Sequence, residues 1–172
     1  MPDSLNVTEH LGVVGVITLS LYDEGGELVE SRTNKNLVTT AGLAALAAAL
    51  NWSGISDQAA NLGLNAPYSL APVYGAVGTG TLPVTSIDTV LTAEVARGTV
   101  SQASAGNGQT AWSFFFGSSQ AVGTISEAGA FAGASITPGS GILIDHVLIN
   151  PPLPKTAAQT MTMQVSFTLA SA

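Results

Sequence analysis

The sequence contains very little charge. Only 9% of its 172 residues are Asp, Glu, Lys or Arg, against roughly 25% in an ordinary soluble domain. Hydrophobic residues make up 46% of the chain. Because solubility normally rests on interspersed surface charge, so neutral a surface favours association. We therefore expect much of it to lie against other copies of the chain or against other proteins.

Positive charge is the scarcest kind. The cationic residues are Arg32, Lys35, Arg97 and Lys155, which form no cluster in a chain with a net charge of −7. Nucleic-acid affinity comes mostly from basic groups that contact phosphates. The sequence therefore predicts no nucleic-acid partner.

Cysteine is absent, which excludes disulfides, thiolate catalysis and cysteine metal sites. The eleven carboxylates are scattered and the two histidines lie far apart in the sequence, so we expect no metal site and no cofactor. The first ten residues, MPDSLNVTEH, lack the basic and then apolar pattern of a signal peptide. Because no apolar run reaches the roughly 18 residues of a membrane span, we expect synthesis in the cytoplasm and no membrane partner.

Alternating hydrophobicity predicts a strand-rich chain. The stretch TMTMQVSFTL, residues 160–169, alternates apolar and polar residues, which is typical of a strand with one buried face. Two β-rich runs flank the glycine-containing turn DEGGE, which suits a hairpin. The proline-rich segment NPPLPKT is expected to break the chain before the last strand. The two strands of the hairpin are predicted at about 12–22 and 27–38. The other predicted strands lie at about 93–103, 109–117, 124–133 and 141–149, with one more inside APVYGAVGTG.

One segment, TTAGLAALAAALNWSG, predicts a helix over about 40–51. Alanine and leucine have high helix propensity, and Thr39 or Thr40 can cap the N-terminus. Leu43, Leu46 and Leu50 recur at helical spacing and should form the buried stripe. The predicted fold is therefore mainly β, a β-sandwich or barrel-like domain with one short Ala-rich helix.

The domain organisation is expected to be simple. We predict an N-terminal arm at 1–11, which carries His10, and a single β-rich domain at 12–172. Residues 51–72 are rich in Asn, Ser, Gly and Pro and predict a long surface loop. Because this loop carries Trp52 and Tyr68, a carbohydrate-binding β-sandwich that stacks sugars on these rings is one alternative function.

No constellation of residues predicts an enzyme. His146 directly follows Asp145 in an apolar run, and adjacent side chains of a strand point to opposite faces, so they cannot form an oriented pair. We expect His146 to face outward or an interface. No G-x-S-x-G nucleophile motif occurs, and the glycine-rich GAVGTG lacks the lysine and the following helix of a phosphate-binding loop. The prediction is a non-enzymatic protein with no catalytic residue.

Aromatic residues concentrate in WSFFFG, residues 112–117. As a strand, this segment places Trp112, Phe114 and Phe116 on one face and Phe115 on the other. The first face should be core. For Phe115 two alternatives stay open, full burial in the chain or a place in an inter-subunit interface.

Arg97 is an isolated charge in the strand-like run VLTAEVARGTV. A buried arginine requires a partner carboxylate. In a strand, Glu94 would lie on the opposite face from Arg97, so Glu127 in ISEAGAF is the expected partner. If the segment ends a short helix instead, Glu94 and Arg97 share a face and pair locally. Either way we expect an architectural ion pair.

The order of several motifs resembles a family of phage and prophage virion proteins. NLVTTAGLAALAAAL, VGTG, DTVLTAEVARGTV, ISEAGAF and GILIDHVLINPPLPKT follow one another and precede the final alternating strand. This order is similar to the N-terminal attachment domain of phage tail-collar fibre proteins, over about residues 36–169. In this resemblance Glu94, Arg97 and Glu127 take the positions of the family's recurring charged residues.

The resemblance implies a non-enzymatic virion component that assembles as a homo-oligomer, a trimer, and docks onto other virion proteins. Within the virion it implies a tail, collar or baseplate-associated attachment module. The chain carries no repeats or heptads after the domain, so we expect no long fibre shaft. A capsid decoration (cement) protein is the alternative, since a small trimer of low charge would also suit the junctions between capsid subunits.

Overall fold

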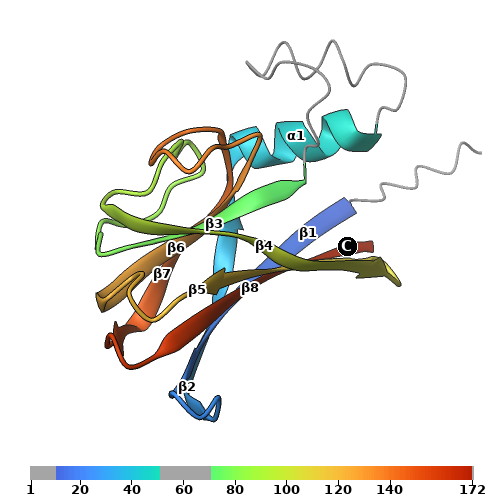
Figure 1. The fold of residues 1–172 in the computed structure, drawn as a ribbon. Coiled ribbons are helices and arrows are strands. Elements are labelled where there is room, and N and C mark those ends of the chain that lie inside the picture. Colours follow the sequence, from blue (N-terminus) through green and yellow to red (C-terminus); the bar gives the residue numbers. More distant parts are fainter. Residues whose placement is uncertain (1–10, 51–70, 172) are drawn as a thin grey trace, which may run out of the picture.

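The computed structural model describes residues 11–50 and 71–171. In this part of the chain eight antiparallel strands close into a barrel in the order β1-β2-β7-β6-β3-β4-β5-β8, and helix α1 lies at one end (Figure 1). The predicted mainly β, barrel-like domain with one short helix is confirmed. The elements are β1 Leu11–Tyr22, β2 Leu28–Val38, α1 Thr40–Leu50, β3 Pro72–Gly78, β4 Glu94–Gly106, β5 Gln109–Phe116, β6 Gly123–Ala132, β7 Ile142–Lys155 and β8 Thr160–Ser171.

The alternating C-terminal run forms β8, which pairs with β1 along its whole length, from Leu11–Ser171 to Tyr22–Thr160. The inward-facing side chains are almost fully removed from water: Met161, Met163 and Val165 are 0% exposed. They pack with residues from β1, β5, β6 and β7 in one core. The period of two in the sequence therefore fixed both the strand and its buried face.

The predicted chain break at NPPLPKT is wrong, because β7 runs through it to Lys155. The register between β7 and β6 passes from Leu148 to Leu153, and Pro151 and Pro152 fall in that irregular stretch. A proline has no N–H to donate to a ladder, and strands tolerate it where regular pairing is interrupted. Leu153 is again 0% exposed, so the strand resumes beyond the prolines.

Helix α1 begins as predicted. The Gly42 N–H donates to Thr39 Oγ1 at 2.9 Å, so Thr39 is the N-cap. The same hydroxyl donates to the carbonyl of Leu143 at 2.5 Å. One threonine therefore caps the helix and attaches it to β7.

The buried face of α1 differs from the predicted leucine stripe at Leu43, whereas Leu46 is half-buried and the Leu50 side chain is outside the described part of the structure. Gly42 lies so close to β7 that a Cβ there would be 2.1 Å from the Ile144 carbonyl oxygen. Ala45 is 2% exposed, whereas Leu43 is 47% exposed. Small residues form the contact because the helix backbone approaches the strand backbone directly, so leucine at these positions would not fit.

Two connections cover part of the outer surface of the barrel. Residues 79–93 join β3 to β4 and residues 133–141 join β6 to β7, and both fold over the same side of the sheet (Figure 1). Beneath them lies a second, smaller apolar cluster: Ala76, Leu91, Phe131 and Leu143. Three buried charged residues described below, Arg97, Glu127 and His146, lie in this region.

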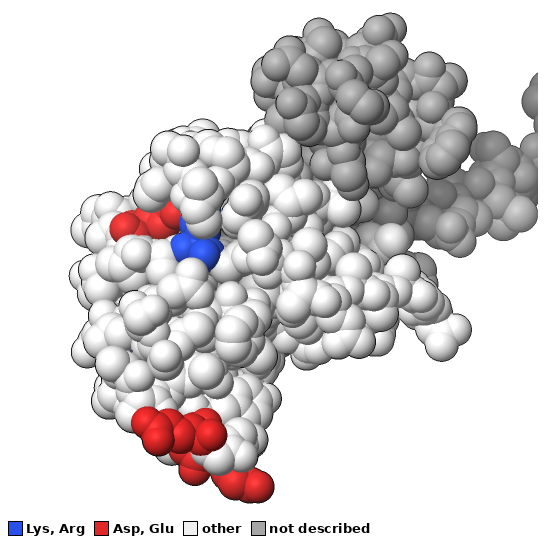
Figure 2. Space-filling model, in the orientation of Figure 1, with Lys and Arg blue, Asp and Glu red and all other residues white. Residues whose placement is uncertain are grey.

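The exposed surface is nearly free of charge on the face drawn in Figure 2. Acidic atoms appear at the end of the molecule where Figure 1 draws the β1–β2 turn, and red and blue atoms otherwise meet in one small area. The turn contains the exposed residues Asp23, Glu24 and Glu27. The low charge of the sequence is therefore visible on this face of the protein.

Candidate functional site: two buried charged clusters

Arg97 is 4% exposed and all of its donor groups have partners. Its Nε and Nη2 donate to Glu94 at 2.5 and 3.0 Å, while Nη1 donates to the carbonyls of Ser135 and Ser140, both at 3.0 Å. The guanidinium also lies 4.1 Å from the centroid of the Phe131 ring. We call this group the Arg97 cluster. It attaches the start of β4 to the 133–141 connection.

The predicted pair between Arg97 and Glu127 is wrong, and Glu94 is the partner. The register explains this: Ala96 pairs with Val77 and Glu94 with the next residue of β3, so Val95 is an extra residue. Such a bulge shifts the alternation of side chains by one. Glu94 therefore lies on the same side as Arg97 although both belong to a strand.

Glu127 is 0% exposed and accepts three backbone hydrogen bonds. The donors are the N–H groups of Gly80 at 3.1 Å, Thr92 at 3.0 Å and Ala93 at 2.7 Å. Burial alone would raise the pKa of this carboxyl, but hydrogen bonds from His146 and the backbone outweigh it and lower the pKa below its ordinary value. Glu127 is therefore held as a carboxylate and ties both ends of the 79–93 connection to β6.

The glycine-rich segment GAVGTG supplies one of these donors, the N–H of Gly80. A Cβ at Gly78 or Gly80 would lie 2.4 or 2.5 Å from Glu127 Oε1. Glycine at these positions lets the backbone approach the carboxylate closely enough to donate. Residues 75–78 of this segment belong to β3, and the anion that its last glycine contacts is a side chain of the same protein.

His146 is 1% exposed, so the predicted outward or interface position is wrong within the chain. Its Nδ1 lies 2.7 Å from Asp88 Oδ2 and its Nε2 lies 3.1 Å from Glu127 Oε2. Burial lowers the pKa of His146. The hydrogen bonds to Glu127 and Asp88 raise it by more than burial lowers it, so the pKa lies above its ordinary value. We call Asp88, Glu127 and His146 the His146 cluster.

Asp145 and His146 do point to opposite faces of β7, as the sequence predicts. Asp145 accepts from the Ala130 N–H at 2.7 Å and from the side-chain amide of Asn36. It is 0% exposed, and burial raises its pKa to about 7. Asn36 Oδ1 is buried and has no partner.

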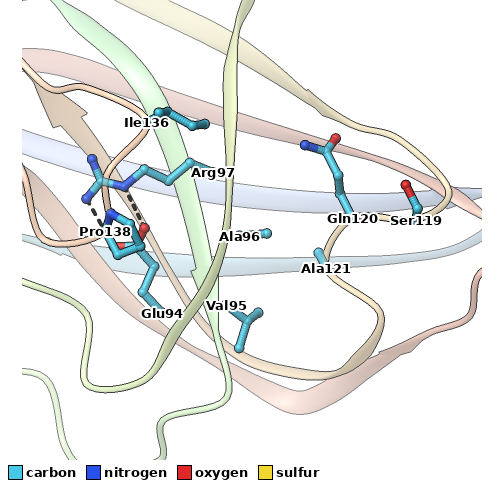
Figure 3. A pocket seen from close by; sticks show the side chains of 9 residues that line it. All are labelled: Glu94, Val95, Ala96, Arg97, Ser119, Gln120, Ala121, Ile136 and Pro138. Carbon is cyan, nitrogen blue, oxygen red and sulfur yellow. Dashed lines mark hydrogen bonds and ion pairs between the residues drawn. The ribbon is translucent and has the colours of Figure 1, made fainter.

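A groove of about 340 Å³ lies beside the Arg97 cluster. Its lining comes from β4, from the β5–β6 turn and from the 133–141 connection (Figure 3). Val95 and Ile136 are 48% and 61% exposed in it. Because the donors of Arg97 are all engaged inside the protein, the groove offers mainly apolar and neutral contacts.

The aromatic face predicted from WSFFFG is confirmed, since Phe114 and Phe116 are 0% exposed and Trp112 packs edge-on against Phe167 at 5.8 Å. Phe115 is 49% exposed, so full burial within the single chain is wrong and the interface alternative stays a prediction. Trp52 and Tyr68, and the N-terminal arm with His10, lie outside the described residues.

The sequence missed Asp88 and the role of His146. Asp88 stands in the loop TSIDT, and nothing in its neighbourhood marks it as a partner for a residue 58 positions away. Among residues 11–50 and 71–171 no group of three or more His, Asp or Glu could hold a metal ion. No helix in that part of the chain is long and apolar enough to cross a membrane.

Comparison with known proteins gives this chain no relatives: no protein-family model, no curated protein and no solved structure matches it.

Proposed function

We propose that this protein is a non-enzymatic structural component of a bacteriophage virion, a tail, collar or baseplate-associated attachment module that works as a homo-oligomer. The observation that carries the proposal is how the protein uses its ionisable residues. Arg97, Glu127, Asp145, His146 and Lys155 are each at most 4% exposed. Their partners lie within the protein, while the face drawn in Figure 2 carries little charge away from the β1–β2 turn.

The exposed side chains support an assembly role. Large apolar residues are open to water on several elements, among them Leu82 at 63%, Ile87 at 78%, Phe115 at 49% and Ile136 at 61%. Exposed apolar surface that charges do not interrupt is typical of protein–protein contact. A closed barrel with internal ion pairs gives such contacts a rigid base, because closure removes the free strand edges.

The test of the proposal is the number of copies per purified virion, measured by quantitative mass spectrometry against the major capsid protein. A count in multiples of three or six, well below about a hundred, supports the tail or collar assignment. A ratio near one copy per three capsid subunits would make the protein a capsid decoration protein instead. Absence from purified particles would overturn both.

Oligomeric state gives a second, independent test. We expect a trimer by light scattering, and we expect Phe115→Ser to weaken it while the fold stays intact, because Phe115 is half exposed in the single chain. Val122→Ser, at a residue that is 52% exposed in the β5–β6 turn, is the matched control. A wild-type protein that stays monomeric at high concentration would contradict the homo-oligomer.

A carbohydrate-binding protein is the rival from another class. A glycan panel read by tryptophan fluorescence separates the two, because sugar stacking on Trp52 would quench its emission. We expect no response, and a saturable quench by one class of glycan would favour the rival.

A further inference from the structure

The position of His146 between two carboxylates determines its protonation. A neutral imidazole carries one N–H and one lone pair, so it can donate to only one acceptor. Here Nδ1 faces Asp88 Oδ2 at 2.7 Å and Nε2 faces Glu127 Oε2 at 3.1 Å. A carboxylate can only accept, so with Asp88 and Glu127 both ionised, the two contacts are hydrogen bonds only when both ring nitrogens carry a proton. The geometry together with the ionised carboxylates therefore favours an imidazolium.

The two carboxylates differ in how freely they can move. Glu127 is 0% exposed and is held by three backbone N–H groups. The Asp88 side chain is 23% exposed, and its other partners, the N–H and Oγ1 of Thr85, belong to its own turn. Asp88 can therefore move into water together with that turn, whereas Glu127 cannot.

The turn at Asp88 has few other attachments to the barrel. Between the ends that Glu127 holds, residues 81–90 are exposed or half-buried. Within residues 11–50 and 71–171, this stretch makes two hydrogen bonds to other elements: the Ser86 carbonyl accepts from the Thr40 N–H at 2.7 Å, and Asp88 contacts His146. The stretch carries Leu82 and Ile87, two of the most exposed apolar side chains described.

We propose that His146 is a proton-dependent latch: as the imidazolium it holds the 81–90 stretch against the barrel, and when it loses a proton it releases Asp88. The proton that leaves is the one on Nδ1, since the buried Glu127 keeps Nε2–H. A lone pair then faces the Asp88 carboxylate at 2.7 Å with no proton between them. Asp88 turns to solvent, and the apolar side chains of the stretch become mobile.

Few other ionisable groups bear on His146. Asp145, the next residue in β7, points to the opposite face, where it bonds to Ala130 and Asn36. β2 meets His146 through Leu37, and α1 contains no ionisable side chain. Asp88 and Glu127 are therefore the two charges that contact the ring, and both favour the imidazolium, while Asp145 interacts with His146 through space without a hydrogen bond.

The test follows the proton and the loop in one sample. In a His10→Gln background the only imidazole is His146, so ¹⁵N and ¹³C shifts of labelled histidine give its titration and its tautomer. Hydrogen-exchange protection of the Thr85 and Asp88 amides reports the loop, with β8 amides as the internal reference. We expect that protection to fall at least tenfold as the imidazole deprotonates, and the neutral form to be the Nε2–H tautomer.

Two variants make the result decisive. Asp88→Asn removes the charge but can still hydrogen-bond the neutral ring, so His146 should titrate at lower pH and loop protection should no longer follow it. The matched control is Asp23→Asn, because the Asp23 carboxylate likewise accepts a backbone N–H, from Glu27 at 2.9 Å. This variant should change neither the titration of His146 nor the protection of the loop amides. Unchanged loop protection through the wild-type titration, or an Nδ1–H neutral tautomer, would overturn the latch.

A third variant identifies the titrating group. Asp145→Asn alters the opposite face of β7 and should leave the loop transition in place. If it abolishes the transition, Asp145 is the responsible group and the proposal is wrong.

Discussion

The Arg97 and His146 clusters use similar parts and behave differently. Each buries one cationic side chain, 4% and 1% exposed, against carboxylate partners under the connections that cover the barrel. The guanidinium of Arg97 stays charged at any ordinary pH and also binds carbonyls and an aromatic ring. The imidazole of His146 is charged only below its pKa, which the two carboxylates raise. The first cluster is a permanent tie, and the second is conditional on pH.

The largest effect should come from Arg97→Met. It leaves Glu94, whose side chain is 6% exposed, without its charge partner, and breaking such a pair typically costs about 3–5 kcal/mol. Urea unfolding measures the loss. Glu94→Gln added to Arg97→Met should recover much of it, while Glu127→Gln should simply add to Arg97→Met. If the losses from Arg97→Met and Glu127→Gln were not additive, the two clusters would be energetically coupled.

The pH dependence of stability should come from β7. The pKa of Asp145 is raised to about 7, so the folded state holds a proton that the unfolded state has already released. The free energy of unfolding therefore falls as pH rises from about 4 to about 7, by roughly 3 kcal/mol. The pKa of His146 is also raised, so its contribution is complete below its ordinary value and is lost as pH rises through the folded value.

The two carboxylates of the His146 cluster act in the opposite direction. The pKa values of Asp88 and Glu127 are lowered, so their contribution is present above their ordinary values and is lost in more acidic solution. Thermal melts from pH 4 to 9 should therefore show the highest stability in mildly acidic solution. Asp145→Asn should flatten the fall up to about pH 7 and leave the later fall due to His146. A profile that rises from pH 5 to 8 would contradict both assignments.

Gly80→Ala should have an intermediate effect and perturb only the His146 cluster. The added Cβ would lie 2.5 Å from Glu127 Oε1, so the turn must move and lose part of its hydrogen bonding, at a cost of about 1–3 kcal/mol. Gly106→Ala, where a Cβ meets nothing within 4 Å, is the control and should be nearly neutral. Equal losses in both variants would mean that the contact with Glu127 is not the cause.

The smallest effect should come from Arg32→Met. Arg32 pairs with Glu30, but their side chains are 26% and 31% exposed, and such pairs contribute about 0–1 kcal/mol. Chemical denaturation should place this variant close to the wild type. A loss as large as that of Arg97→Met would show that burial is not what distinguishes the two arginines.

The strands were predictable because alternation is a local signal. The run that became β8, the DEGGE hairpin and the Thr39 cap each depend on residues a few positions apart, and each formed where expected. The same locality explains one error. Prolines in NPPLPKT argue against a strand, yet β7 continues, since its pairing with β6 is irregular at that point.

The charged clusters were only partly predictable. The sequence showed that Arg97 needs a carboxylate, but the choice between Glu94 and Glu127 depended on one bulge at Val95. A bulge is created by pairing with β3, and no residue in VLTAEVARGTV announces it. The burial of His146 could not be predicted either, because it depends on a contact between distant parts of the chain. The connection that covers His146 contains Asp88, which is 58 positions away in the sequence.

By itself the sequence determined a sparsely charged, strand-rich domain with one alanine-rich helix, because composition and periodicity act through neighbouring residues. Only the tertiary structure decided which charges meet. Closing eight strands into a barrel and folding two connections over it brings positions 88, 127 and 146 within hydrogen-bonding distance. Ionic contacts act over a few ångströms in space, so the register of the strands, which no single segment specifies, assigns each charge its partner.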